Sequence, residues 1–481
     1  MRLMILGGGS SQLGAFRRAR ELGITTILAD RDPNAPARAP ADEFVPASTF
    51  DIDAVVDAAR MTRAEAIIAL GTDQPVLTAA VASARPGLPF PLTPERALSV
   101  TNKRVMKQIF DDEGIPTPRW CLIGPDRTEW ERRGFFRLRP PYVVKPVDSQ
   151  GQRGIIIANT PDEVAAQYPV TRSYSREEEI LVEEYFPSRE VTVSGWAYSP
   201  DEVEIWTVTD RVTIDNPPGL GVCLAHRYPS YHAGSHLPRI EELTHRIVRS
   251  FRLGGGPIYF QMLVGAEGQA RTRLPAGTEE PSVVPAGTEV PPRQELSGET
   301  PPGDGSGEER IGIIQPVLVN EIAFRLGGAY EDQSIPPVTG VDLLARQLNT
   351  ARNGFSVAAP AAGARGGAVP EYTHFAVPLI FARPGTVARL SGAEELLTLP
   401  GITDCRFILP EGTVIREMTN STQRIAYAVL HGTSAEEINT LVDTVFDTLR
   451  VENPDGENLL LDTRDGTKHP VPPGSQGVAY R

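Results

Sequence analysis

The first hundred residues alternate short apolar runs with amphipathic stretches, the pattern of a sheet whose strands are joined by helices. Strands are predicted where apolar and β-branched residues run together, and helices where apolar residues recur at helical spacing. The predicted strands are 2–6, 25–29 and 66–70, and the predicted helices are 12–22 and 52–61. Strand, helix and strand in succession build parallel sheets, so a Rossmann-like domain is expected here.

A glycine turn at 7–9 joins the first strand to the first helix, and Asp30 follows the second strand. This arrangement is similar to the dinucleotide fingerprint, but Gln12 stands where that fingerprint has its third glycine. An NAD-dependent enzyme is therefore a remote alternative. The segment Gly-Thr-Asp at 71–73 follows the third strand, and its simpler interpretation is a helix cap rather than the wall of a substrate crevice.

A helix at 101–113 is predicted from apolar positions on one face and from Thr101, a good N-cap. Lys103 lies in its first turn, where a cation opposes the helix dipole. Lys103 is therefore either a solvated surface residue or one held for an anionic ligand.

Two β-branched runs, 142–144 and 155–157, predict a pair of strands joined by a glycine-bearing turn at 148–154. Lys145 ends the first strand. A lysine in an apolar run is costly to bury unless it meets an anion, so the hairpin fits a cover over phosphates. The alternative is a surface hairpin with a lysine that reaches solvent.

Further strands are predicted at 180–186, 190–197, 258–264 and 317–322, with a helix at 240–251. Between the last two strands, 266–310 is rich in Pro, Gly, Glu and Thr and repeats Pro-Ala-Gly-Thr-Glu, which predicts a disordered insertion. The two strands that flank it should still pair in space, because closing a long loop adds little free energy.

Beyond an Ala/Gly-rich loop at 357–368, short strands and turns begin near 372. Ser434 and Glu437 form a capping-box pattern that opens a helix, a closing strand and turn are expected at 451–461, and the end from 463 resembles a loose tail or short extension. The expected domains are a Rossmann-like domain at 1–98, a second domain with the insertion at 99–345, and an α+β domain with the tail at 346–481.

The formal charge of −14 and the pI near 5.2 disfavour nucleic acid as a partner. Neither a signal peptide nor a membrane-spanning run is seen, so a cytoplasmic protein without membrane association is expected. Cys121, Cys223 and Cys405 are scattered and odd in number, so neither a disulfide framework nor a thiolate metal site is supported.

Four motifs in order resemble the ATP-grasp superfamily. The first is Tyr-Val-Val-Lys-Pro at 142–146 with Gly151 and Gly154, which matches the lysine strand and glycine flap. The second and third are Ile-Leu-Val-Glu-Glu-Tyr-Phe at 180–186 and the following Glu190, which match the adenine hinge and ribose segment. The fourth is Val-Asn-Glu-Ile-Ala-Phe-Arg at 319–325 with its two glycines, which matches the metal-bearing strand.

The resemblance implies an α/β and α+β protein with a Rossmann-like sheet, a two-subdomain ATP-grasp core and a C-terminal α+β region. It implies ATP and Mg²⁺ (or Mn²⁺) as cofactors, because lysines and flap amides suit a triphosphate and oxygen ligands suit magnesium. The expected nucleotide-binding residues are Lys103, Lys145, Ser149, Gln150, Gly151, Gly154, Glu183, Glu184, Tyr185, Phe186 and Glu190. The expected metal ligands are Gln261 and Glu321, the catalytic residues are Lys145 and Arg325, and the substrate candidates are Arg211, His226, Arg325, Gly327 and Gly328.

Ala323 stands where the family often has asparagine, and Asn320 precedes the glutamate instead. This pattern is similar to that of carboxyaminoimidazole ribonucleotide synthases, although Phe324 replaces their proline. It leaves the number of metal ions open.

The expected function is an ADP-forming ligase that activates a carboxylate as an acyl phosphate for attack by an amine, of amino-acid or peptide ligase type. The expected partners are small carboxylates and amines. A bicarbonate-activating carboxylase or carbamoyl-phosphate-type enzyme and a non-catalytic nucleotide-binding protein are the alternatives. The sequence leaves a homodimer open.

Overall fold

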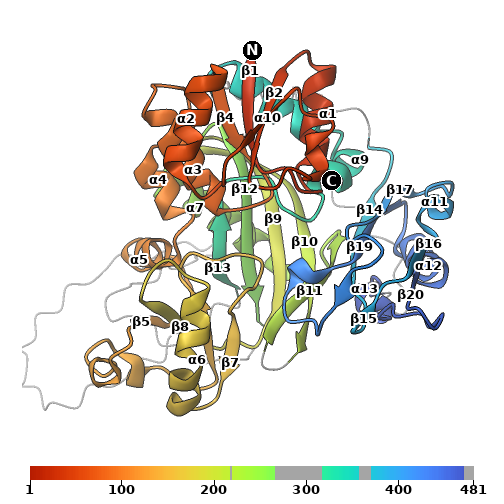
Figure 1. Ribbon diagram of the computed structural model, residues 1–481. Coiled ribbons are helices and arrows are strands. Elements are labelled where there is room, and N and C mark those ends of the chain that lie inside the picture. The colour runs from red at the N-terminus through yellow and green to blue at the C-terminus, as the bar shows by residue number, and fades with distance from the viewer. Residues whose placement is uncertain (217–218, 266–316, 357–369, 471–481) are drawn as a thin grey trace, which may run out of the picture.

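The computed structural model describes residues 1–216, 219–265, 317–356 and 370–470, and the side chains of 215–220 are not described. The insertion expected at 266–310 and the loop expected at 357–368 lie outside these residues. Figure 1 shows the N-terminal domain above a central set of long strands, with a small lid beside these strands and the C-terminal region on their other side.

The N-terminal domain holds a parallel four-stranded sheet in the order β3-β2-β1-β4. Its strands are β1 (Arg2–Leu6), β2 (Thr25–Asp30), β3 (Glu43–Pro46) and β4 (Ala66–Ala69), and its helices are α1 (Leu13–Glu21), α2 (Ile52–Thr62), α3 (Gln74–Ala84) and α4 (Pro94–Ser99). The strands are largely buried because helices cover both faces of the sheet. The expected Rossmann-like sheet is confirmed.

Helix α5 (Lys103–Asp112) leads from this domain into the lid. Its N-cap is Asn102, whose side chain accepts hydrogen bonds from the backbone N–H groups of Arg104 and Val105. The prediction that Thr101 caps this helix is wrong, because the Thr101 hydroxyl instead donates to the carbonyl of Ala97 at 2.8 Å. The shift by one residue keeps Lys103 in the first turn.

The lid contains four antiparallel strands in the order β7-β6-β8-β5, with one helix. They are β5 (Trp120–Ile123), β6 (Tyr142–Pro146), β7 (Ile156–Ala158) and β8 (Ile180–Glu184), with α6 (Pro161–Ser173). The predicted hairpin is therefore present as β6 and β7. Every residue of β6 is buried, including Lys145.

Long antiparallel strands form the centre of the molecule, and helix α7 (Leu237–Ser250) packs its apolar face against them. The strands are β9 (Arg189–Ser199), β10 (Glu202–Asn216), β11 (Gly219–Tyr228), β12 (Gly256–Val264) and β13 (Val317–Ala323). Strands β12 and β13 pair with Gln261 opposite Glu321, so the pairing predicted across the insertion is confirmed.

The C-terminal region continues the same sheet, because β14 (His374–Ile380) pairs with β11. The helices that lead into this region are α8 (Glu331–Ser334), α9 (Pro336–Thr339) and α10 (Leu343–Arg352). Its other elements are β15 (Gly385–Thr386), β16 (Arg389–Ser391), α11 (Ala393–Leu396), β17 (Ile402–Phe407), β18 (Val414–Ile415), β19 (Ala426–Gly432), α12 (Ala435–Thr448), β20 (Arg450–Glu452) and α13 (Arg464–Thr467).

The described part of the expected tail is not loose. His469 is buried, its ring nitrogen Nε2 lies 3.1 Å from the carbonyl oxygen of Phe375, and its backbone N–H donates to Asn439 at 2.7 Å. Within the described part of the chain, every helix is too short or too polar to traverse a bilayer.

Candidate active site

A cleft of about 640 Å³ opens where the N-terminal domain, the lid, the central strands and the C-terminal region meet. It brings together most of the residues predicted from the sequence. These are Lys103, Lys145, Ser149, Gln150, Gly151, Glu183, Glu184, Tyr185, Phe186, Glu190, Arg211, His226, Gln261, Glu321, Arg325 and Gly328. The predicted residues Gly154 and Gly327 lie outside the lining.

Lys103 projects from the first turn of α5 toward Glu321 on β13. Its Nζ lies 2.8 Å from Oε1 of Glu321 and donates to the backbone carbonyl of Ser149, also at 2.8 Å. Burial penalises the ammonium, but the Glu321 carboxylate outweighs this effect and raises the pKa of Lys103. Lys103 is therefore a buried cation rather than a solvated one.

Lys145 and Lys107 share one buried carboxylate. Glu183 Oε2 lies 2.5 Å from Nζ of Lys145, and its Oε1 lies 2.6 Å from Nζ of Lys107. Burial alone would raise the pKa of Glu183, but the two ammonium groups lower it to about 2, so the carboxylate is ionised. Lys145 also donates to Oδ1 of Asn320 at 3.0 Å.

The sequence reasoning missed Lys107, although a signal was available. Lys107 follows Lys103 by four residues, which places both on one face of α5. The chain contains 47 Lys and Arg residues, of which only Lys103, Lys107, Lys145 and Lys468 are lysines. Three of the four lysines therefore meet at this site.

The glycine flap touches both the N-terminal domain and the C-terminal region. Gln150 Oε1 accepts hydrogen bonds from the backbone N–H groups of Asp73 and Gln74, at 2.6 and 3.3 Å, at the start of α3. Gln152 Nε2 donates to the carbonyl of Gly221, and Gln152 Oε1 bonds with the Ser421 hydroxyl. The flap thus lies across the cleft.

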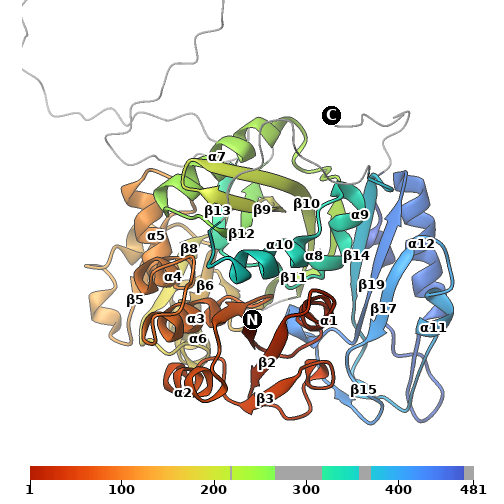
Figure 2. The same ribbon diagram turned by 90° about the horizontal axis from the view of Figure 1, so that it is seen from above.

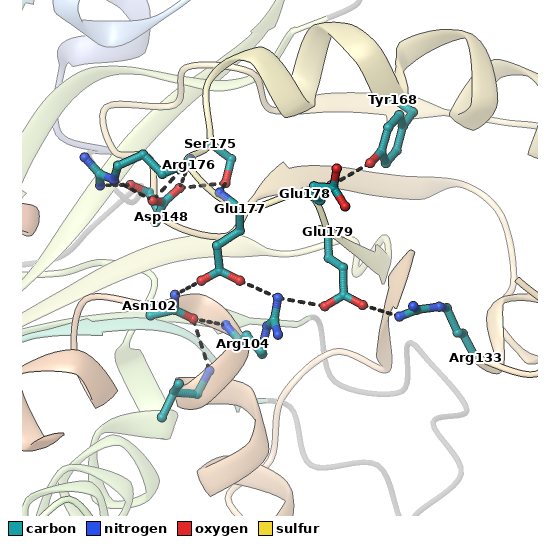
Figure 3. Close-up of polar contacts among 11 residues, drawn as sticks. Asn102, Arg104, Arg133, Asp148, Tyr168, Ser175, Arg176, Glu177, Glu178 and Glu179 are labelled. Atoms are coloured by element: carbon teal, nitrogen blue, oxygen red, sulfur yellow. Dashed lines mark hydrogen bonds and ion pairs between the residues drawn. The ribbon is translucent and has the colours of Figure 1, made fainter. Parts of the chain in front are cut away.

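A polar network outside the cleft joins the flap base to the N-cap of α5 (Figure 3). The Asp148 carboxylate accepts from the Ser175 hydroxyl at 2.7 Å and from Nε of Arg176 at 2.9 Å. Glu177, which follows Arg176, accepts a hydrogen bond from Nδ2 of Asn102 at 2.5 Å and forms an ion pair with Arg104. The network therefore links the flap to the helix that carries Lys103.

Arg325 is held by the N-terminal domain. Its Nε and Nη2 each lie 2.6 Å from Oδ1 of Asp73, and its guanidinium lies 4.5 Å from the centroid of the Tyr259 ring. Asp73 makes no side-chain cap on α3. The helix-cap interpretation of 71–73 is therefore wrong, because the carboxylate of Asp73 serves Arg325 and the segment lines the cleft.

The two glycines after Arg325 are packed closely. The backbone N–H of Gly327 donates to Oε2 of buried Glu331 at 2.5 Å, and Ser194 donates to Oε1 of Glu331 at 2.6 Å. A Cβ at Gly328 would lie 2.7 Å from the backbone oxygen of Gly71. Gly327 therefore supports the loop, while Gly328 allows two loops of the cleft wall to approach.

Three predicted hinge residues, Glu184, Tyr185 and Phe186, line the cleft where β8 ends. Oε1 of Glu184 accepts from the backbone N–H of Arg139 at 3.0 Å, and the N–H of Tyr185 donates to the carbonyl of Pro141 at 2.9 Å. The hinge is thereby fixed to the segment that enters β6.

Partly exposed Glu190 and buried Arg211 form an ion pair between neighbouring strands β9 and β10. The Glu190 carboxylate overrides the effect of burial and raises the pKa of Arg211. The pKa of His226 on β11 changes in the opposite direction, because burial and the nearby Arg211 and Arg424 lower it to about 3. Its imidazole is therefore neutral at physiological pH.

The C-terminal region supplies cleft residues that the sequence reasoning did not single out: Ser421, Thr422 and Arg424. Arg424 is half-buried and donates to the carbonyls of Ser421 and Gly328 at 3.3 and 3.4 Å. Among the described residues it has no carboxylate partner within ion-pair distance. Its positive charge is therefore available to an anion in the cleft.

Gln261 and Glu321 fit a magnesium ion that takes its remaining ligands from phosphates and water. Lysines lie on two of the nearby oxygens, since Oδ1 of Asn320 accepts from Lys145 and Oε1 of Glu321 pairs with Lys103. Within the described ranges, no cluster of three His, Cys, Asp or Glu residues is arranged to hold a metal. The donor set thus suits a metal that arrives with a nucleotide rather than one caged by protein.

Comparisons with known proteins find similarity to several ligases and to a formyltransferase. The family model for L-amino acid ligase C-terminal domain 2 matches residues 378–453. A D-alanine–D-alanine ligase from Synechococcus sp. (strain JA-3-3Ab) is 36% identical over 112 residues, which are 22% of this chain and 33% of that protein. A formate-dependent phosphoribosylglycinamide formyltransferase from Sulfurisphaera tokodaii is 23% identical over 266 residues, 54% of this chain and 65% of that protein.

Taken together, these comparisons indicate the ATP-grasp superfamily. Among solved structures, an L-amino acid ligase from Bacillus licheniformis superposes with a TM-score of 0.69 at 15% identity, covering 94% of this chain and 98% of that one. The chain spans about a third of the length of the D-alanine–D-alanine ligase that it matches.

Proposed function

We propose that this protein is an ATP-dependent, ADP-forming ligase that joins a carboxylate to an amine, with amino acids or peptides as substrates. The observation that carries the proposal is the convergence of Lys103, Lys145 and the Gln261–Glu321 pair in one cleft. The family-model match to the L-amino acid ligase C-terminal domain supports the substrate class.

In this proposal Lys103 and Lys145 neutralise the triphosphate, and backbone N–H groups of the flap cover its terminal oxygens. Positioning and charge neutralisation are most of what phosphoryl transfer requires of a protein. Gln261 and Glu321 would hold Mg²⁺, which supplies charge neutralisation between the phosphates when bound. The base of the nucleotide would lie against Tyr185 and Phe186.

The substrate carboxylate would lie at the end of the cleft that Arg325 and Arg424 share. Arg325 is held by Asp73, which fixes the direction of its fork, and Arg424 brings a charge that no described carboxylate neutralises. A planar guanidinium suits both a carboxylate and an acyl phosphate. The phosphoryl group would pass from ATP to the carboxylate oxygen, and the amine would then displace phosphate from the acyl carbon.

Pairwise incubation of amino acids with MgATP tests the proposal through ADP release, with hydroxylamine added to trap the acyl phosphate as a hydroxamate. We expect ADP and hydroxamate from the wild type and neither from Lys145→Ala. AMP in place of ADP, or equal rates in both proteins, would refute ligation at this site.

A second candidate reaction, activation of a one-carbon acid such as bicarbonate or formate, is favoured by the longer match to the formyltransferase. The same assay separates the two, because ADP release that needs bicarbonate or formate but no amino acid would favour it. A nucleotide-binding protein without catalysis would bind ADP and release none from ATP.

A further inference from the structure

Lys107 lies behind the cleft rather than in it. Its side chain is 1% exposed and is absent from the cleft lining. Nζ of Lys107 pairs with Glu183 at 2.6 Å and donates to the hydroxyl of Thr117, which in turn donates to the carbonyl of Val319 on β13 at 2.8 Å. Lys107 therefore reaches the cleft only through Glu183.

The charges in this cluster make that indirect contact important. Glu183 is ionised and lies 2.5 Å from Lys145, so these two residues alone would form a neutral pair. A neutral pair attracts a triphosphate much less than a lone ammonium does. With Lys107 included, the three residues carry a net positive charge.

We propose that Lys107 is a positioning residue for nucleotide binding: it neutralises Glu183, so that Glu183 orients Lys145 without cancelling its charge toward the phosphates. This inference rests on the proposed function, since it requires that the cleft bind a nucleotide.

The composition of the chain supports this role. Arginine supplies nearly all of the 47 basic residues, yet a lysine occupies this buried position. A compact ammonium lies between Glu183 and Thr117, where it pairs with the carboxylate and donates a hydrogen bond to the hydroxyl. Burial and the nearby ammonium of Lys145 lower the pKa of Lys107, and the paired Glu183 carboxylate opposes this effect.

The test measures dissociation constants for ADP and for adenosine by calorimetry in four proteins. These are the wild type, Lys107→Met, the double variant Lys107→Met/Glu183→Gln, and Lys468→Met. Lys468 pairs with Asp443 at 2.7 Å outside the cleft lining, so its variant removes the same charge elsewhere. The ratio of the two constants reports phosphate binding and does not depend on the fraction of folded protein.

Lys107→Met is expected to weaken ADP binding roughly tenfold or more while leaving adenosine binding unchanged. Adding Glu183→Gln should restore most of the loss, because the uncompensated carboxylate is removed. Lys468→Met should behave as the wild type.

An unchanged ADP-to-adenosine ratio in Lys107→Met would overturn the inference while leaving the proposed function intact. A double variant that binds ADP no better than the single variant would also overturn it, since a purely structural role predicts that outcome. Absence of ADP binding by the wild type would instead refute the proposed function, and this inference with it.

Discussion

Asp332 makes the stability of this protein depend on pH in a way that one substitution can isolate. It lies on α8 in a groove of about 370 Å³ between α1 and β17, separate from the cleft. Its Oδ2 is so close to Gly14 of α1 that a Cβ there would lie 2.3 Å away. Burial, with Glu331 and Asp404 nearby, raises the pKa of Asp332 to about 7.

The raised pKa of Asp332 determines whether the stability of the fold rises or falls with pH. An acid whose pKa is raised in the folded state stabilises the fold while protonated, and this contribution is lost as the pH rises from about 4 through about 7. A pKa of about 7 in place of 3.8 corresponds to an upper limit of about 4 kcal/mol. Arg17, Arg18 and Arg406 also line the groove, and their rearrangement toward the carboxylate would reduce this value.

Urea unfolding of the wild type and of Asp332→Asn between pH 5 and pH 8, followed by tryptophan fluorescence, measures the effect. We expect the free energy of unfolding of Asp332→Asn, relative to the wild type, to increase by about 1–3 kcal/mol over this interval, because part of the effect is already lost below pH 5. Asp57→Asn, whose side chain is 81% exposed on α2, serves as the control. A difference that stays constant from pH 5 to pH 8 would refute the reasoning.

Three further predictions use the same structure. Gly328→Ala should reduce ADP release at least tenfold, because its Cβ would collide with the backbone of Gly71. Gly124→Ala, where the nearest atom is 3.9 Å away, should leave the rate of ADP release unchanged. Equal rates in the two variants would contradict this packing. Glu190→Gln should lower the free energy of unfolding by about 3 kcal/mol, because it leaves Arg211, which is only 7% exposed, without its partner. Glu452→Gln should lower it by less than about 1 kcal/mol, because its partner Arg389 is 71% exposed. Similar losses in the two variants would argue against this difference in burial. The three buried cysteines should resist a thiol reagent at pH 8 until urea is added. Burial raises the pKa of Cys121 and Cys405 to about 12 and also raises the pKa of Cys223, so little reactive thiolate forms. Rapid labelling of the native protein, measured by absorbance, would contradict their burial.

Local sequence was sufficient where a feature is built from neighbouring residues. The hairpin of β6 and β7, with Lys145 at the end of its first strand, depends on two β-branched runs and a glycine turn, and the structure contains it. The pairing of Gln261 with Glu321 could also be predicted, because both lie on apolar strands that flank one insertion. The N-cap of α5 was harder to predict, because Thr101 and Asn102 are both residues that cap helices well. The hydrogen bond from the N–H of Lys103 to the carbonyl of Val147, a residue distant in sequence, favours Asn102 as the cap.

The sequence by itself therefore determined several strands, the resemblance to a superfamily, and a set of candidate residues of which most reach the cleft. The tertiary structure alone decided which charges meet. Asp73 pairs with Arg325 across 252 positions, Gln152 bonds with Ser421 across 269, and Lys107 reaches Lys145 only through Glu183. Hydrophobic periodicity reports the face that a residue occupies on its own element, whereas the partner of a buried charge depends on how distant elements pack.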